Sequence, residues 1–227
     1  MSRTLAGYAH GVEDEAPSAA PWVPEGRSLA RLRSAATACQ GCELWHDTTQ
    51  TVFSTGPRDA VLMLVGEQPG DVEDREGEVF VGPAGRILDQ ALERAGIERD
   101  SVYLTNAVKH FRHENRGKRR IHQKPAVAHI VACRPWLAAE VAIVRPDVVV
   151  AMGSVAARSV LGRPVKINDE RGQWLGEEEA SISPDVAVMV TTHPSAVLRL
   201  RGLDDPGLAR RELNTLVRDL RRASRRT

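Results

Sequence analysis

Ala60-Val-Leu-Met-Leu-Val-Gly-Glu-Gln-Pro-Gly70 joins an apolar run of strand length to a glycine-rich loop. Residues 60–65 are continuously apolar, as expected of a buried strand, and Gly66 ends the run. The loop continues through Gly85 and leads into a helix predicted over residues 86–95. Glycine lets the backbone approach a ligand closely, and a helix N-terminus favours anionic or polar groups. The loop is therefore a candidate binding segment, although such turns are also common without a ligand.

Strands and helices alternate along the rest of the chain. Strands are predicted at residues 102–105, 147–152 and 186–190, and helices at residues 28–38, 126–144, 154–161 and 207–221, with Ser28 and Ser154 as N-caps. This alternation predicts an α/β fold, a three-layer α/β/α arrangement around a central, mainly parallel, four-stranded sheet. Ligand sites of such folds lie at the carboxyl ends of the strands, so the segments after the strands are the place to look for chemistry.

The length and composition of the chain favour one domain. With 227 residues and 42% apolar side chains, it can bury one substantial core. Residues 1–25 are rich in Ala, Pro, Gly and acidic residues, so we expect a tail without stable structure, followed by a single domain over residues 26–227. No apolar run approaches the roughly 20 residues of a membrane span, and the signal-peptide pattern is absent. The sequence therefore predicts a soluble, cytoplasmic protein with no membrane contact.

The charge of the chain is nearly balanced. Lysine and arginine number 31 against 30 aspartate and glutamate residues, so no global positive field indicates a nucleic-acid partner, and any basic footprint must be local. The arginine-rich end of the chain is interpreted as a solvated helix face and frayed tail in preference to a DNA contact.

The cysteine pattern indicates a metal centre. Three cysteines cannot pair completely, and the spacing Cys39-Gln-Gly-Cys42 suits a metal or cluster better than a disulfide framework. For the third, Cys133, an ordinary buried thiol is an equally simple interpretation.

An amide and an imidazole follow two of the predicted strands. Asn106 comes after the second strand and His193 after the fourth, so both are expected at the same edge of the sheet. An Asn side chain can accept from the N3–H of uracil while donating to O4, a pattern that opposes cytosine. Either residue alone would more simply be a turn former or a satisfied loop residue. Together they indicate a site that reads a base.

At this point the motifs carry a family resemblance. The segments Gly66-Glu-Gln-Pro-Gly70, Glu73-Asp74, Phe80-Val-Gly-Pro-Ala-Gly85, Thr105-Asn-Ala-Val-Lys109 and His193-Pro-Ser195 resemble the uracil-DNA glycosylase superfamily, in particular family 4 and its UdgX branch, over residues 39–220. The resemblance implies that Phe80 stacks on a flipped uracil, that Asn106 reads its Watson–Crick edge and that His193 hydrogen-bonds its O2. It implies a monomer acting on uracil-containing DNA, with single-stranded DNA as the expected form.

The implied reaction is scission of the N-glycosidic bond. As this bond lengthens, C1′ acquires oxocarbenium character and uracil leaves as an anion, so a donor at O2 and carboxylates near the sugar both favour the transition state. His193 suits the first role. Glu67, Asp71 and Asp74 are candidates for the second, although at least one of them is equally well explained as part of a solvated acidic loop.

The resemblance also implies a [4Fe–4S] cluster. Family 4 enzymes hold theirs with four cysteines, and this chain has His110 where the fourth is expected, as in the UdgX type. The ligand set becomes Cys39, Cys42, His110 and Cys133, with a structural role. Three thiolates and one imidazole could equally hold zinc.

A basic segment before Pro125 resembles the loop that distinguishes the UdgX type. Lys118-Arg-Arg-Ile-His122 occurs together with His110 at the cluster position and with Gln68 where family 4 has alanine. The resemblance assigns His122 as a nucleophile, adds Gln68 and Asp71 to the substrate site, and makes DNA contacts of Lys118, Arg119, Arg120 and Ser195. A simpler interpretation is a basic loop that grips DNA phosphate without chemistry.

The predicted outcome is a protein that excises uracil and then stays attached to the DNA. The three cations beside His122 should disfavour its imidazolium form, and Glu67 could orient the ring or take its proton. Imidazole would then compete with water for C1′ and leave a stable histidine–DNA bond. The alternatives are a multiple-turnover family 4 glycosylase and a non-catalytic iron-sulfur or zinc module that binds nucleic acid or a protein partner. The combination of Phe80, Asn106 and His193 argues against the second of these.

Overall fold

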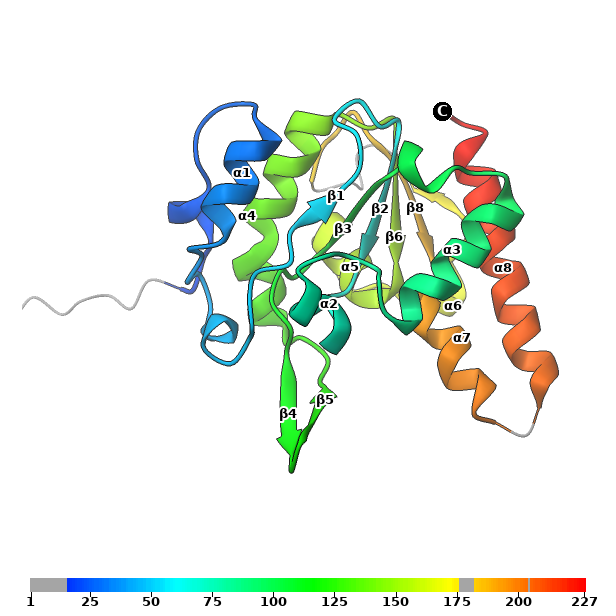
Figure 1. Cartoon of the computed structure of the whole chain (residues 1–227). Coiled ribbons are helices and arrows are strands. Elements are labelled where there is room, and N and C mark those ends of the chain that lie inside the picture. The colour runs from blue at the N-terminus through cyan, green and yellow to red at the C-terminus, as the bar shows by residue number, and fades with distance from the viewer. Residues whose placement is uncertain (1–15, 176–181, 204) are drawn as a thin grey trace, which may run out of the picture.

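The computed structural model describes residues 16–175, 182–203 and 205–227, and its centre is a six-stranded mixed sheet (Figure 1). The strand order is β1-β3-β2-β6-β8-β7, with bounds Ser54–Thr55 (β1), Leu62–Gly66 (β2), Tyr103–Asn106 (β3), Val148–Met152 (β6), Trp174–Leu175 (β7) and Ala187–Thr191 (β8). The four central strands are parallel, and β1 and β7 pair antiparallel at the edges. The predicted parallel strands are confirmed. Each edge strand has two residues, too few to produce a sequence pattern.

Helices cover both faces of the sheet. The bounds are Leu29–Ala36 (α1), Asp71–Glu76 (α2), Pro83–Ala95 (α3), Val127–Val144 (α4), Gly153–Leu161 (α5), Ile167–Glu170 (α6), Pro194–Arg201 (α7) and Pro206–Ser224 (α8), and single turns of 3-10 helix lie at Ala20–Trp22, Glu43–His46 and Arg99–Ser101. Helices α1, α4 and α5 pack on one face, and α3, α7 and α8 on the other. The three-layer α/β/α prediction is therefore confirmed.

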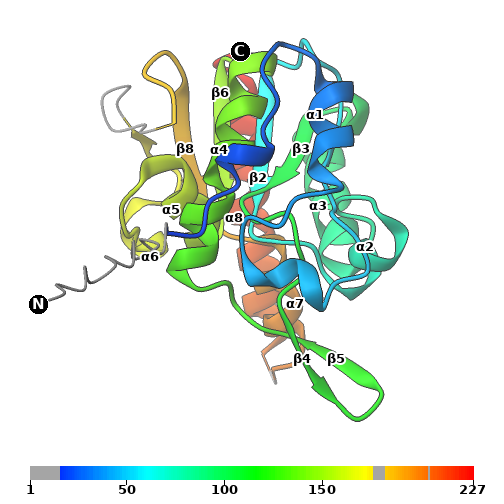
Figure 2. The same ribbon diagram turned by 90° about the vertical axis from the view of Figure 1, so that its left-hand side faces the viewer.

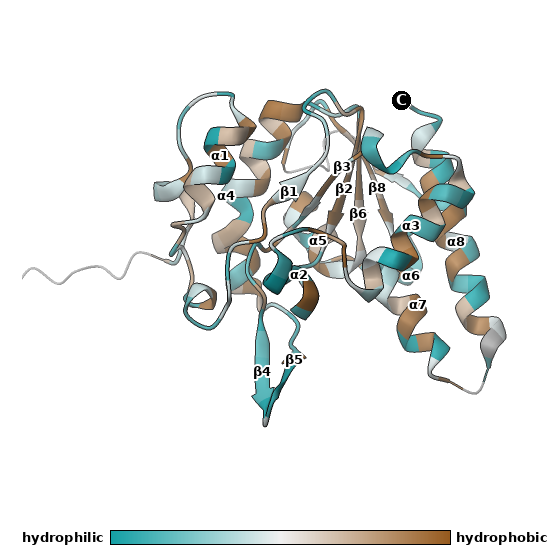
Figure 3. Cartoon of the chain, in the orientation of Figure 1, coloured by the Kyte–Doolittle hydropathy of each residue, from teal (hydrophilic) through white to brown (hydrophobic). Residues whose placement is uncertain are grey.

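The central strands are apolar because helices bury both of their faces. Along β2, Met63 and Val65 join the core under α4 and α5, while Leu62 and Leu64 join the core under α3 and α8. Figure 3 shows these strands as a hydrophobic band between helices whose outer faces are polar. Helix α4 is apolar and long enough to cross a membrane, but more than half of it is buried in this core, which accounts for its composition.

The capping and turn residues in the sequence predicted some of the observed helix ends but not others. Ser28 caps α1 by accepting from the Arg31 backbone N–H, as predicted. Ser154 is not a cap, because α5 already begins at Gly153, whose φ of 88° suits glycine. The loop predicted through Gly85 contains α2, and α3 begins at Pro83, a residue with φ preset for the first helical position.

Residues 16–25 are the part of the predicted tail that the structure describes. Residues 1–15 lie outside the described part of the chain, but Ala19 is buried and its N–H donates to the Ala132 carbonyl of α4 at 2.7 Å. A 3-10 turn follows at Ala20–Trp22. The prediction of an unstructured segment up to residue 25 is therefore wrong for this stretch, because small residues pack closely against α4.

The polar segment before Pro125 forms a β-hairpin that projects from the body (Figures 1 and 2). Strands β4 (His113–Arg116) and β5 (Arg119–His122) pair antiparallel, so that His113 lies opposite His122 at the base. Gly117 at the tip has a φ of 60°. The sequence indicated only a long polar loop, because both strands are mostly exposed and lack alternating apolar residues.

Candidate active site

A cavity of about 840 Å³ opens at the carboxyl ends of the central strands. This volume suits a small-molecule-sized group such as a nucleobase with its sugar. Eight of the predicted site residues line the cavity, and they come from five separate segments of the chain: Glu67, Gln68, Asp71, Phe80, Asn106, His122, His193 and Ser195. Apart from the four predicted metal ligands, which also lie outside the lining, four predicted residues do not line it: Asp74, Lys118, Arg119 and Arg120.

The side chain of Asn106 presents an unsatisfied acceptor to this cavity. Asn106 is 2% exposed, and its Oδ1 is buried without a hydrogen-bond partner. Gly66 makes room for it, because a Cβ at Gly66 would lie 2.3 Å from that oxygen and 2.6 Å from the Phe80 ring. A buried carbonyl oxygen without a donor is costly in a folded protein. The arrangement is suited to a ligand that brings an N–H.

His193 presents an unsatisfied donor. Its Nδ1 accepts the backbone N–H of Ser195 at 3.1 Å and lies 2.8 Å from the Ser195 hydroxyl. Burial, with Arg199 and His122 adding to it, lowers the pKa of His193 to about 3, so the ring is neutral near pH 7. Because Nδ1 is an acceptor, the single ring proton is on Nε2, which is buried and without a partner. The site therefore combines one unpaired acceptor with one unpaired donor.

Phe80 supplies an apolar wall between these two groups. The side chain is 5% exposed, and its ring centroid lies 6.4 Å from that of His193. Its backbone has a φ of 56°, a left-handed conformation that is strained for a bulky residue. Arg99 donates to the Phe80 carbonyl at 3.3 Å, and Gly85 leaves room for this carbonyl, which would lie 1.8 Å from a Cβ at that position.

The side chains of Glu67 and His122 lie next to each other in the lining of the cavity. His122 Nε2 lies 3.5 Å from Glu67 Oε1, and the His122 side chain is about half exposed. Burial and the nearby Arg199 lower the pKa of His122, whereas burial raises the pKa of Glu67. The sequence predicted a neutral His122, and the direction agrees. The expected cause was wrong, since burial and Arg199 act in place of the adjacent cations.

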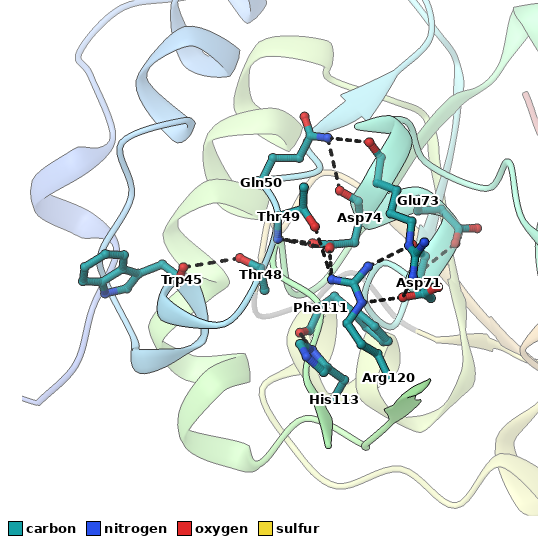
Figure 4. Close-up of polar contacts among 12 residues, drawn as sticks. Trp45, Thr48, Thr49, Gln50, Asp71, Glu73, Asp74, Phe111, His113 and Arg120 are labelled. Carbon is teal, nitrogen blue, oxygen red and sulfur yellow. Dashed lines mark hydrogen bonds and ion pairs between the residues drawn. The ribbon is translucent and has the colours of Figure 1, made fainter. Parts of the chain in front are cut away.

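Arg120 anchors the hairpin to α2 and is not a free DNA contact (Figure 4). Its Nε donates to Asp71 Oδ1 at 2.5 Å and its Nη1 to Asp74 Oδ2 at 2.6 Å. The guanidinium also lies over the Phe111 ring, 5.4 Å from the centroid. Asp74 is fully buried and accepts the Thr49 backbone N–H as well. Asp74 therefore stabilises the contact between α2 and the hairpin, whereas it was predicted to lie beside the sugar. Asp71 lines the cavity and is paired with Arg120.

Gln68 also holds the hairpin. Its Nε2 donates to the carbonyls of Arg112 and Gln123 at 3.1 Å each, and its Oε1 accepts the Arg112 N–H at 3.0 Å. These two residues flank the strands β4 and β5. Both amide protons of Gln68 are engaged, so this residue lines the cavity and supports the base of the hairpin. Its contact with substrate stays a prediction.

Lys118 and Arg119 lie at the exposed tip of the hairpin, away from the cavity. Ser195 lies at the start of α7, where its N–H and hydroxyl both hold His193. The predicted DNA contacts thus occupy three separate places: Lys118 and Arg119 at the tip, Ser195 in the cavity lining, and Arg120 against α2.

The three cysteines gather behind the site. Cys39 and Cys133 are buried, and burial, with Cys42 and Cys39 nearby, raises the pKa of Cys133 to about 12. Cys133 Sγ accepts the Lys109 backbone N–H at 3.3 Å, and Cys39 Sγ accepts Trp136 Nε1–H at 3.2 Å. Within the described residues, no group of three or more His, Cys, Asp or Glu side chains has metal-binding separation.

The hydrogen bonds of His110 nevertheless suit a metal ligand. Thr51 donates its hydroxyl proton to the Ala36 carbonyl, so it can only accept from His110 Nε2 at 2.9 Å. Burial lowers the pKa of His110 to about 4, which leaves a neutral ring with its lone pair on Nδ1. Metal-bound histidines typically donate their other N–H in this way. The donor set therefore fits a thiolate-rich centre in its chemistry.

Three charged residues that were not predicted as site residues, Glu73, Lys124 and Arg199, also line the cavity. Glu73 accepts from the N–H groups of Gly70 and Gly82 at 3.1 and 3.0 Å, which joins the two glycine-rich segments. Lys124 and Arg199 place positive charge at the rim. Spacing gave a weak signal for Arg199, which follows Ser195 by one helical turn, but no sequence signal marked Glu73 as buried.

Comparison with known proteins agrees with this geometry. A family model described as the uracil DNA glycosylase superfamily matches residues 53–221. A type-4 uracil-DNA glycosylase of Sulfurisphaera tokodaii is 32% identical over 179 residues, covering 75% of this chain and 76% of the relative. Another, of Thermotoga maritima, is 36% identical over 167 residues, covering 72% and 79%. A type-5 uracil-DNA glycosylase of Pyrobaculum aerophilum is 29% identical over 211 residues, covering 86% and 85%. Because the family model runs from β1 into α8 and these relatives align over most of both lengths, the chain belongs to the uracil DNA glycosylase superfamily.

Proposed function

We propose that this protein excises uracil from DNA by cleaving the N-glycosidic bond. The observation that carries the proposal is the pair of unsatisfied groups in the cavity, Asn106 Oδ1 and His193 Nε2. Uracil offers an N3–H donor to the first and the O2 acceptor to the second, whereas cytosine would set its N3 lone pair against the Asn106 oxygen. The names of the type-4 and type-5 relatives support the same activity.

The substrate would be a base flipped out of the DNA strand. An extruded base loses its stacking partners, and Phe80 offers an aromatic face inside the cavity to replace them. As the bond to C1′ breaks, its electron pair moves into the ring and negative charge develops on O2. The neutral His193 would strengthen its Nε2–H hydrogen bond to this oxygen, and the carboxylate of Glu67 would favour the positive charge on the sugar.

For the second step, the proposal assigns His122 as the nucleophile. A neutral imidazole in the cavity wall has one nitrogen lone pair, and this pair can form a bond to the C1′ cation that remains after uracil has left with the electron pair of the broken bond. The alkylated ring would then lose the proton from its other nitrogen, and Glu67, whose pKa is raised, would accept it. The product is a neutral imidazole joined to the abasic sugar, so the protein acts once.

The second candidate is a conventional multiple-turnover glycosylase. The type-4 relatives favour it, and it needs the same three groups that recognise uracil. In that case water takes the place of His122 at C1′, and the hairpin only positions DNA. The two candidates differ in the fate of the sugar and not in the selection of the base.

The proposal includes a [4Fe–4S] cluster held by Cys39, Cys42, Cys133 and His110. Such a cluster would supply a structural link between the segment after α1, the end of β3 and α4. Backbone and indole N–H groups already donate to two of the sulfurs, as is usual for bound thiolates. Single-stranded DNA and a monomeric state remain parts of the proposal.

The experiment that tests the proposal is a denaturing gel of protein incubated with an oligonucleotide that carries one uracil. A one-to-one species that survives boiling in detergent is expected, because a carbon–nitrogen bond is indifferent to salt and denaturant, unlike phosphate contacts. An oligonucleotide with thymine should give none. His122→Ser should abolish this species yet still release uracil, since water can capture the sugar.

His113→Ser is the matched control, because His113 lies opposite His122 in the same hairpin but outside the cavity lining. This variant should keep the adduct. Release of abasic DNA over many turnovers by the wild-type protein would favour the conventional glycosylase. An adduct that persists in His122→Ser would assign the bond to another residue. If uracil is not released by any form, the excision proposal itself fails.

A further inference from the structure

A hydrogen-bonded chain leads from Arg199 to the unpaired nitrogen of His193. Arg199 Nη1 donates to Ser195 Oγ at 3.0 Å, and this oxygen lies 2.8 Å from His193 Nδ1. The Ser195 backbone N–H also donates to Nδ1, at 3.1 Å. Arg199 and Ser195 are one turn apart on α7, so the helix fixes their separation.

The direction of these hydrogen bonds follows from the chemistry of the groups. A guanidinium has five N–H donors and no acceptor, so Ser195 Oγ must accept from Arg199. Its own proton is then free to point at Nδ1, which accepts from both the hydroxyl and the backbone N–H of Ser195. Two donors aimed at Nδ1 exclude a proton there, and the ring keeps its proton on Nε2, facing the cavity.

We propose that Arg199 is a positioning residue for the excision reaction: by directing the Ser195 hydroxyl at Nδ1 it reinforces the Ser195 backbone N–H, and together they hold the His193 tautomer whose Nε2–H serves uracil O2. The inference rests on the proposed function in its choice of uracil as the ligand. It goes beyond that function by assigning a residue outside the motifs of the resemblance, and by making Ser195 a relay in addition to a DNA contact.

The charge of Arg199 adds to this role. Arg199 lines the cavity, and among the described residues no carboxylate oxygen lies within 4 Å of its guanidinium. Its positive charge faces Glu67, His122 and His193, whose pKa values it lowers. When negative charge develops on O2, a cation two hydrogen bonds away polarises the donor in the favourable direction. The same cation adds to burial, the larger cause, in lowering the pKa of both histidines.

A surface arginine at a cavity rim could instead contact only DNA phosphate. The two roles differ in a measurable way, because a phosphate contact changes DNA affinity and its salt dependence but leaves the ring tautomer untouched. The tautomer of a histidine is read directly from the chemical shifts of its two ring nitrogens in ¹⁵N-labelled protein, without any substrate.

The experiment compares Arg199→Met, which removes both donor and charge, with Arg199→Gln, which keeps a donor for Ser195. Arg201→Gln is the matched control, since Arg201 is on the same helix, is exposed and lies outside the cavity lining. In wild-type protein we expect one His193 signal pattern, that of the Nε2–H form. Arg199→Met leaves the Ser195 backbone N–H as a donor to Nδ1 but no longer directs the hydroxyl, so we expect a minor population of the Nδ1–H tautomer beside the Nε2–H form. Uracil release at saturating DNA should slow by roughly 10- to 100-fold, the range for loss of a charge-assisted hydrogen bond.

Arg199→Gln should keep the tautomer and recover part of the rate, and Arg201→Gln should match wild type in both. An unchanged tautomer and an unchanged rate at saturating DNA in Arg199→Met would overturn the proposal, as would a loss confined to DNA affinity and salt dependence. Equal losses in Arg199→Met and Arg201→Gln would also overturn it. If wild-type protein shows the Nε2–H tautomer but releases no uracil, the assignment of uracil fails while the relay stands.

Discussion

Replacing Arg120 with alanine should separate uracil excision from capture of the DNA. Arg120 links β5 to α2 through Asp71 and Asp74, and its side chain is 16% exposed while that of Asp74 is 0% exposed. Removal of one partner of a buried ion pair typically costs about 3–5 kcal/mol, because the other charge stays buried and unpaired. Asp74 keeps its hydrogen bond from the Thr49 N–H and Arg120 is not fully buried, so we expect about 2 kcal/mol at this site.

For a domain of this size, that loss lowers the melting temperature by about 4–8 °C. The residues that recognise uracil lie on other segments, so uracil release should fall by less than threefold, on the order of 0.6 kcal/mol. Adduct formation should fall further, because His122 follows Arg120 by two residues on the released strand. Thermal unfolding followed by circular dichroism gives the first quantity, and gels that separate free abasic DNA from adduct give the other two.

Arg119→Ala is the control for this experiment, since Arg119 is adjacent in sequence, equal in charge and exposed at the tip. It should leave the melting temperature unchanged. If Arg120→Ala has the stability and adduct yield of Arg119→Ala, the hairpin does not depend on this ion pair and the reasoning fails.

Three further outcomes follow from the site. Asn106→Asp should slow uracil release by 10-fold or more, because a second carboxylate would repel the departing anion and cannot donate to O4; wild-type rates in a uracil-release assay would exclude Asn106 as the base reader. His110→Ala should lower the iron and sulfide content of purified protein more than it lowers uracil release per cluster-containing molecule, and an unchanged metal content would remove His110 from the ligand set. Adduct formation should persist below pH 6.5, the ordinary pKa of histidine. The lowered pKa of His122 keeps the ring neutral until the pH falls through that lower value. A single-turnover rate of adduct formation whose pH midpoint lies at or above 6.5 would contradict a neutral His122 with a lowered pKa.

The sequence predicts the parts of this fold that are buried on both sides. The central strands β2, β6 and β8 are continuous apolar runs between turn residues, so burial alone identifies them. The hairpin strands carry charged side chains in solvent, and their pairing depends on Gln68, which is distant in sequence. The sequence of the hairpin itself contains no pattern that would predict its contact with Gln68.

The residues of the site divide in the same way, into those that the sequence predicts and those whose roles depend on partners distant in sequence. Asn106 and His193 were predicted together because each follows a strand at the same edge of the sheet, and the family resemblance added Phe80. All three line one cavity. Arg120 was assigned to DNA because it lies in a basic segment that resembles the UdgX loop, and such a segment can grip DNA phosphate. Its partners lie 49 and 46 residues away, and the burial of Asp74 that makes the pair strong is a property of the whole fold.

His122, the proposed nucleophile, lies at the base of the hairpin, and the exposed residues lie at its opposite end. His122 and His113 pair at the base, whereas Arg116 and Arg119 form the last pair before the tip. Gln68 and Arg120 fix the lower part of the hairpin to the body, so we expect changes in the length or charge of the tip to leave the position of His122 unchanged. If the tip contacts DNA as proposed, its residues could then be varied to alter DNA binding without altering the proposed chemistry at the base.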